Sequence, residues 1–331
     1  MKHIVEEWQQ NICDSALWDF YFDGMRAGSL DIETTGLDPK RNKFVLGGVY
    51  DAGACALHQV LAGSRAEESE ALAEYMGTLA DLDVVMTYNG RNFDIPFLNT
   101  RLTACGLPLD CGHLYDLDLY QVLSGHSQLR RLLPNMRQKT VENYMGLWET
   151  RADEISGAES VELFDRYELT GDPDAEARIL LHNNDDVRQL TRLTAAIKKS
   201  NFHRAMFRMG FPVKAGGHMI TVRDIRLCRD TIEYSGIQNR NPVKYTGFEL
   251  NGWPVMSSFG GSGFSISLPV IRKHGMTVVD LEAAGIADNG FECYPDCVSG
   301  FLVLETADGI RYRETNHFIK EFTKKFMEEN L

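Results

Sequence analysis

The sequence predicts an α/β domain built on a mixed five-stranded sheet flanked by helices, followed by a C-terminal β-rich α+β accessory domain. Three observations predict it. Apolar segments over residues 27–119 follow the order strand, strand, strand, helix, strand, helix, strand, which implies a mixed sheet with helices packed on it. Residues 120–200 have helical patterning. Beyond residue 210, glycine and serine become frequent, and short alternating segments indicate strands.

Each element has its own signal. Residues 1–24 carry apolar side chains at helical spacing and are predicted to form a helix. Short apolar runs bounded by turn residues predict the five strands, over 27–32, 43–50, 55–61, 83–88 and 113–119. Apolar residues on one face predict helices over 66–80 and 92–105.

The last helix of the first domain has the clearest start. Asp172 is expected to cap it, with Pro173 at the first helical position and acidic residues in the first turn. A terminal helix is expected over 316–330. We therefore expect three parts: an N-terminal helix over 1–24, the α/β domain over 25–200, and an accessory domain of unassigned type over 201–331.

Composition excludes several classes of protein. The 331 residues are 44% hydrophobic and 24% charged, which is ordinary for a globular chain and excludes a disordered one. No apolar run approaches the roughly 18–20 residues that a membrane helix needs, and the N-terminus lacks the apolar core of a signal peptide. A cytoplasmic location is expected. The seven cysteines, an odd number without an export signal, argue against a disulfide framework.

The charge is unevenly distributed. The net charge of −13 belongs to residues 1–200, because residues 201–331 hold equal numbers of acidic and basic side chains. Residues 201–245 interleave aromatic with basic residues, eight basic against three acidic. This segment could guide single-stranded nucleic acid. Alternatively, Phe202, Phe207 and Phe211 pack at the seam between the two domains while the charged side chains are solvated.

Two acidic residues end the first predicted strand. Asp31 and Glu33 are two positions apart, so both point to the same side of the strand. Two carboxylates side by side repel one another unless a cation lies between them. A strand-to-loop junction with solvated acids is the alternative interpretation.

Two further motifs carry acids. Asp94 follows the Asn89-Gly90 turn and lies in the first turn of a helix, where it could equally be a cap. His182 and Asp186 are four apart on one helix and so reach the same face, where they could also form a simple surface pair. Together, four carboxylates from a strand end, a helix start and a late helix suit Mg²⁺ or Mn²⁺, and two such ions would clamp a phosphodiester.

The three motifs DIETTGL (31–37), YNGRNFDIPF (88–97) and HNNDDV (182–187) resemble those of the DEDD-type 3′–5′ exonucleases of the ribonuclease H-like superfamily. The resemblance covers about residues 27–195 and does not reach 210–331. It is closest to the YprB-like group, whose linking segment is similar to residues 139–147, 153–157 and 167–172.

The resemblance implies a set of site residues. The ligands of two divalent metal ions, Mg²⁺ or Mn²⁺, would be Asp31, Glu33, Asp94 and Asp186. Contacts to the substrate would come from Thr35, Gly36, Leu37, Asn89 and Phe93. Leu37 and Phe93 offer apolar faces on which a base can stack, although Phe93 suits the core equally well.

His182 departs from the family pattern. One subtype has tyrosine four positions before the last aspartate, and the other has histidine five positions before it; here the histidine stands at the tyrosine's spacing. His182 could deprotonate or orient the attacking water, or only hydrogen-bond to it. Asp185 is a weaker alternative to Asp186 as the ligand.

The function expected from these residues is a two-metal-ion 3′–5′ exonuclease that acts on single-stranded DNA or RNA 3′ ends and releases nucleoside monophosphates. A structure-selective endonuclease with the same metals is an alternative, and so is a catalytically silent nucleic-acid-binding module on the same fold. The presence of all four acids argues against the silent module.

Overall fold

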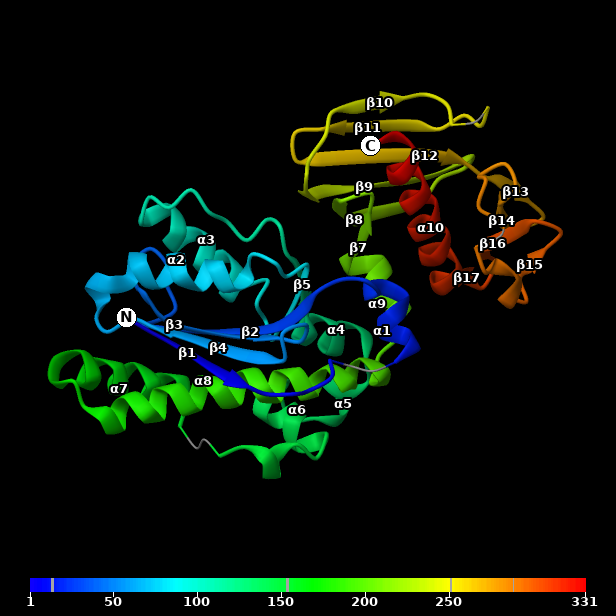
Figure 1. The fold of residues 1–331 in the computed structure, drawn as a ribbon. Helices are drawn as coiled ribbons and strands as arrows, with labels where there is room; N and C mark the ends of the chain where they lie inside the picture. Colours follow the sequence, from blue (N-terminus) through cyan, green and yellow to red (C-terminus); the bar gives the residue numbers. More distant parts are fainter. Residues whose placement is uncertain (13–14, 153–154, 251, 288) are drawn as a thin grey trace. The chain divides into compact units, whose positions relative to one another are not determined.

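The computed structural model describes residues 1–12, 15–152, 155–250, 252–287 and 289–331. Cys13 and the first two residues of the 153–157 segment lie outside these ranges. The chain divides into two compact units, Met1–Ser200 and Asn201–Leu331, and each is described by itself (Figure 1).

The first unit is built on a six-stranded mixed sheet in the order β1-β4-β3-β2-β5-β6. Its strands are β1 (Lys2–Glu7), β2 (Ala27–Thr34), β3 (Phe44–Asp51), β4 (Ala56–Leu61), β5 (Val84–Thr87) and β6 (Tyr115–Asp118). β2, β5 and β6 are parallel to one another, and the remaining pairs are antiparallel. The predicted fold class is confirmed, with one strand more than the five expected.

The additional strand overturns the prediction of a helix over residues 1–24. Residues 2–7 pair antiparallel with β4 from Lys2↔Leu61 to Glu7↔Ala56 and form an edge of the sheet. The β-branched Ile4 and Val5 suit an extended backbone, and sheet pairing overrides the apparent helical spacing. Among the described residues of this segment, Ala16–Phe22 form the one helix, α1, which the side chain of Ser15 caps.

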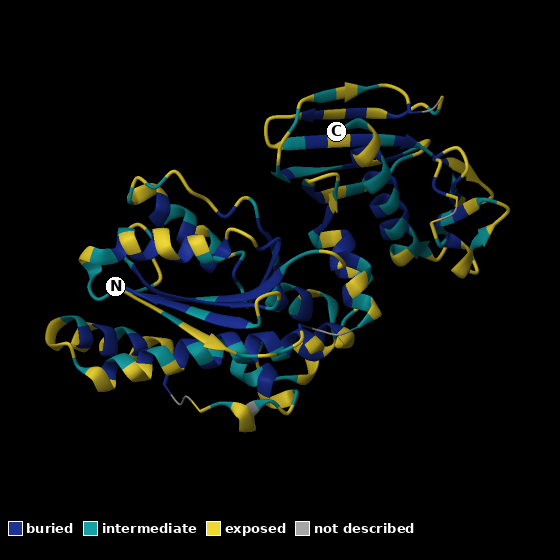
Figure 2. Ribbon diagram, in the orientation of Figure 1, coloured by how far each residue is buried: buried dark blue, intermediate teal, exposed yellow. Residues whose placement is uncertain are grey.

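Helices cover both faces of this sheet (Figure 1). α2 (Glu68–Leu79) and α3 (Asp94–Ala104) pack on one face, and α7 (Gly157–Thr170) and α8 (Pro173–Leu193) on the other. The central strands are buried, whereas β1 is largely exposed (Figure 2). The shorter helices between β6 and α7 are α4 (Leu119–His126), α5 (Leu129–Leu132) and α6 (Gln138–Tyr144).

Helix α8 starts as the sequence predicts. The side chain of Asp172 accepts a hydrogen bond from the backbone N–H of Asp174, and Pro173 occupies the first turn. Two glycines of β3 let helices approach the sheet from both sides: a Cβ on Gly47 would lie 2.6 Å from the Tyr75 ring of α2. A Cβ on Gly48 would lie 2.2 Å from the Asn183 Oδ1 atom of α8.

The second unit contains two antiparallel sheets. The larger one has the order β10-β11-β12-β9-β8-β7, and the smaller one runs β13-β14-β16-β15 with β17 paired to β16. The strands are β7 (Phe211–Ala215), β8 (His218–Leu227), β9 (Thr231–Arg240), β10 (Tyr245–Gly247), β11 (Met256–Gly260), β12 (Gly263–Pro269), β13 (Ile271–Lys273), β14 (Met276–Asp280), β15 (Cys297–Val298), β16 (Phe301–Thr306) and β17 (Gly309–Ile310).

Two helices complete this unit, α9 (Phe202–Met209) and the terminal α10 (Tyr312–Asn330), the latter close to its predicted position. Phe202, Phe207 and Phe211 are buried, which favours packing over base stacking for the aromatic residues of this segment. Within the described parts of the chain, no helix is long and apolar enough to cross a membrane.

The close approach of α8 to β3 predicts the effect of a single methyl group. Gly48→Ala would place a Cβ against Asn183 and Val187, so we expect the free energy of unfolding to fall by about 1–3 kcal/mol. Gly77→Ala is the matched control. Position 77 is a helical glycine of α2 with open space around it, and the change should raise stability by about 0.5–1 kcal/mol. Urea unfolding measures both variants, and equal stability of Gly48→Ala and wild type would contradict the packing.

Candidate functional site

Alternate residues of β2 face α8 and are polar. The Ser29 hydroxyl lies 2.9 Å from the hydroxyl of Thr191, which donates to it. The Asn183 amide donates to Asp31 Oδ2 at 3.0 Å. Because residues i and i+2 of a strand share a face, Glu33 lies on the same side, as the sequence predicts. This polar seam brings the end of β2 against the middle of α8.

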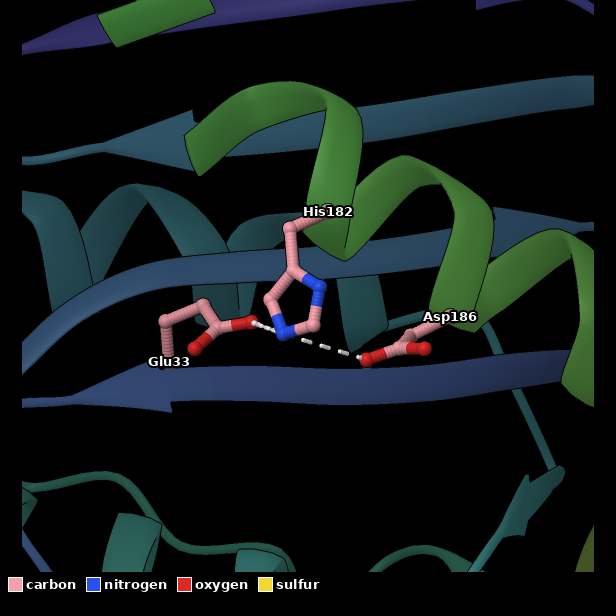
Figure 3. Close-up of side chains that lie close together, drawn as sticks. All are labelled: Glu33, His182 and Asp186. Carbon is pink, nitrogen blue, oxygen red and sulfur yellow. Dashed lines mark ion pairs between the residues drawn. The ribbon is translucent and has the colours of Figure 1, made fainter. Parts of the chain in front are cut away.

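Glu33, His182 and Asp186 form the tightest group of potential metal-ligating atoms in the described part of the chain, all within 4.8 Å of one another. Figure 3 shows the His182 ring on α8 with one nitrogen between the two carboxylates. The Nε2 atom lies 3.6 Å from Glu33 Oε1 and 3.6 Å from Asp186 Oδ2. His182 is only 4% exposed.

Asp31 lies amid the other carboxylates. Removal from water and the charges of Asp186, Glu33 and Asp94 raise the pKa of Asp31 well above its usual range. Asp94 at the start of α3 is also buried, and this burial raises its pKa to about 7, although nearby backbone N–H groups favour the charged form. The four predicted acids therefore form one electrostatically coupled group.

A buried arginine holds one oxygen of Asp186. Arg151 Nη2 lies 2.5 Å from Asp186 Oδ1 and 3.0 Å from Glu142 Oε1, and the side chains of Arg151 and Glu142 are almost completely buried. An unpaired buried charge is costly, so each member of this group depends on the others. Sequence reasoning missed Arg151 because no short-range motif connects it to position 186.

The two candidates for the last acidic position have different surroundings. Asp185 is not part of the trio, and its carboxylate accepts a hydrogen bond from the backbone N–H of Ala152 at 2.6 Å. Asp186 lies within the trio. The geometry thus favours Asp186 over Asp185 as a ligand.

The trio opens into a cleft of about 1000 Å³. Three of the five predicted substrate-contact residues line it, namely Gly36, Leu37 and Phe93. Leu37 is 82% exposed, so its side chain is accessible. Phe93 also packs against the core beside Phe97, so the core role expected for it is present, and its contact with substrate stays a prediction.

The other two predicted contacts lie elsewhere. The Thr35 hydroxyl accepts a hydrogen bond from the Lys43 backbone N–H at 2.9 Å and closes a loop between β2 and β3. Asn89 has a φ of 71° and lines a neighbouring hollow of about 660 Å³. The two hollows share Asn135, Arg137 and Gln138, so Asn89 is near the cleft without lining it.

The donor set fits divalent cations. Carboxylate oxygens are the ligands that Mg²⁺ and Mn²⁺ prefer, and four of them are crowded together with raised pKa values at Asp31 and Asp94. Such crowding is unfavourable for the charged forms unless positive charge compensates it. Arg151 supplies only one such charge within hydrogen-bonding distance of Asp186.

Comparisons with known proteins identify the first unit. A family model described as the RNase_H superfamily matches residues 29–198, a range that includes all the predicted acids. No curated protein matches the chain. Among solved structures, the family B DNA polymerase from the hyperthermophilic archaeon Pyrobaculum calidifontis is similar at 16% identity with a TM-score of 0.40, over 63% of this chain and 34% of the polymerase. The chain thus covers about a third of that polymerase's length.

The raised pKa values predict a pH-dependent stability of the metal-free protein. In the folded state the carboxyl of Asp94 favours the protonated form, so its contribution to stability is present below about pH 4 and is lost as the pH rises through about 7. Asp94→Asn should therefore match wild type near pH 4, become progressively more stable than wild type as the pH rises, and exceed it by roughly 2 kcal/mol or more near pH 8 in EDTA. Urea unfolding at both pH values measures this difference.

Asp83→Asn provides the control. Asp83 is also buried, but its carboxylate accepts a hydrogen bond from the Arg26 backbone N–H, so this variant should gain no stability near pH 8. Saturating Mn²⁺ should stabilise wild type more than Asp94→Asn. A metal-free Asp94→Asn protein that is less stable than wild type near pH 8 would contradict the assignment.

Proposed function

Because the chain belongs to the RNase_H superfamily, we propose that it is a metal-dependent nuclease of DEDD type. It acts as a 3′–5′ exonuclease on single-stranded DNA or RNA and releases nucleoside monophosphates. The observation that supports this proposal most is the coupling of Asp31 with Glu33, Asp94 and Asp186 beside an open cleft. A purely structural acidic cluster would not need an accessible cleft.

In this proposal Asp31, Glu33, Asp94 and Asp186 hold two divalent cations, Mg²⁺ or Mn²⁺. When bound, these ions supply Lewis acidity that activates a water molecule and stabilises the oxygen leaving phosphorus. Asn183 orients Asp31, and the Ser160 hydroxyl, which donates to Glu33 Oε2 at 3.0 Å, orients Glu33. Arg151 fixes Asp186 in the same way.

The lining of the cleft supports a nucleic-acid substrate. Leu37 and Phe93 offer apolar surface for a terminal base, and Gly36 lets the backbone approach closely. Arg137 and Lys139 line the same cleft and supply positive charge for phosphates. Asn89 and the adjoining hollow, which also contains Arg130, would then contact the nucleotides that follow.

The second unit is proposed as an accessory domain that guides the strand. Its first 45 residues present exposed basic side chains on α9, β7 and β8 and in the connections that follow. These are Arg204, Arg208, Lys214, Arg223, Arg226, Arg229 and Lys244. Such side chains can neutralise phosphates without reading the sequence.

Digestion of labelled single-stranded DNA and RNA tests the nuclease. Wild type with Mg²⁺ or Mn²⁺ should produce a ladder that shortens from the 3′ end, and EDTA should prevent it. Asp31→Asn should reduce the rate by at least about a hundredfold while the fold remains, because it removes ligand charge with little change in shape.

Asp81→Asn is the control, since Asp81 is 79% exposed and pairs with Arg26 outside the cleft. Its rate should equal that of wild type. Internal cleavage products would favour the endonuclease instead. Absence of cleavage in the folded, metal-loaded protein would favour the catalytically silent nucleic-acid-binding module. Full activity of Asp31→Asn would disprove the assignment of Asp31 as a metal ligand.

A further inference from the structure

The imidazole of His182 presents its Nε2 atom to two carboxylates at once. Its Nε2 atom lies 3.6 Å from Glu33 Oε1 and 3.6 Å from Asp186 Oδ2. A nitrogen–oxygen separation of 3.6 Å is too long for a hydrogen bond. The Nε2 atom therefore faces both carboxylates at ion-pair distance but beyond hydrogen-bonding distance.

These separations are close to those between donor atoms around a single cation. Nitrogen and oxygen donors lie about 2.0–2.2 Å from a bound Zn²⁺ or Mg²⁺. Neighbouring donors are then about 3.0 Å apart in octahedral geometry and about 3.4 Å apart in tetrahedral geometry. The observed 3.6 Å exceeds the tetrahedral value by a few tenths of an ångström, as expected for three donors that a cation would draw together.

The remaining oxygens of the two carboxylates are held by other donors. Glu33 Oε2 accepts a hydrogen bond from the Ser160 hydroxyl, while Oε1 faces His182. Asp186 Oδ1 pairs with Arg151, while Oδ2 faces His182. Each carboxylate thus has one oxygen fixed by the protein and the other directed at the imidazole nitrogen (Figure 3).

The backbone that carries His182 is also fixed. The next residue, Asn183, donates to Asp31 through its Nδ2 atom and accepts from the Gln59 amide at 3.0 Å. Because His182 is buried on a docked helix, its ring has little freedom to turn away from the two carboxylates. Metal ligands held in this way lose little entropy on binding.

We propose that His182 is a direct nitrogen ligand of a divalent cation that it shares with Glu33 and Asp186, instead of a general base. This inference rests on the proposed metal-dependent function for the presence of the cation. Imidazole is a borderline ligand that suits transition metals better than Mg²⁺. The trio accordingly selects a cation such as Mn²⁺ over Mg²⁺.

Pulsed electron paramagnetic resonance of bound Mn²⁺ tests this directly, because a coordinated imidazole nitrogen modulates the electron spin echo. The full chain without a histidine tag, loaded with one equivalent of Mn²⁺, should show ¹⁴N coupling. His182→Phe should lose it. His113→Phe, which alters a histidine bonded to the Leu79 carbonyl, should keep it.

Metal affinities give a second measurement. Calorimetry should show the Mn²⁺ dissociation constant of His182→Phe raised at least about tenfold, with a much smaller change for Mg²⁺. A merely structural role of His182 would weaken both metals in parallel, and that result would overturn the proposal.

Each remaining outcome also decides the question. Tight Mn²⁺ binding that Asp31→Asn weakens, but without ¹⁴N coupling in wild type, would overturn the ligand role and leave the nuclease proposal intact. Coupling that persists in His182→Phe would assign the nitrogen to another residue. Failure of the proposed nuclease function is a different result, because it would appear as absence of phosphodiester cleavage by wild type in the digestion experiment.

Discussion

The docking of α8 on β2 and β3 is the contact on which the candidate site depends. Asn183 reaches Asp31, and Thr191 reaches Ser29, so the helix is bonded to one strand at two points about two turns apart. The absence of a side chain at Gly48 lets the helix lie this close. Because His182 precedes Asn183, the same contact that seats the helix also aims the imidazole at Glu33.

The docking of α8 on β2 and β3 crowds carboxylates together, which is unfavourable when they are charged. The crowded carboxylates of Asp31 and Asp94 favour their protonated forms, in contrast to Glu68, whose ion pairs with Arg101 and Lys43 lower its pKa. Both environments are buried in the same unit, but among the described residues no cationic side chain forms an ion pair with Asp31 or Asp94, and Arg151 pairs only with Asp186 of the four acids. Residues that destabilise a fold locally are typical of functional sites, where a ligand supplies the missing compensation.

Local patterns explain which parts of this structure the sequence could predict. The alternation of Asp31 and Glu33, the four-residue spacing of His182 and Asp186, and the capping by Asp172 are short-range signals, and the structure agrees with each. Residues 2–7 were wrongly assigned to a helix because their pairing partner lies some 55 positions away. Arg151 and Ser160 were missed for the same reason, since their roles depend on distant partners.

The separation in sequence between the two halves of the polar seam also determines when the site can assemble during synthesis. Asp31 and its partner Asn183 are 152 positions apart. During synthesis the strands of β2 to β6 can pair while α8 is still inside the ribosome, since domains fold as their residues emerge. The acidic cluster, however, is incomplete until Asp186 has emerged. The site therefore assembles only after α8 has left the ribosome, while residues of the second unit are still being added.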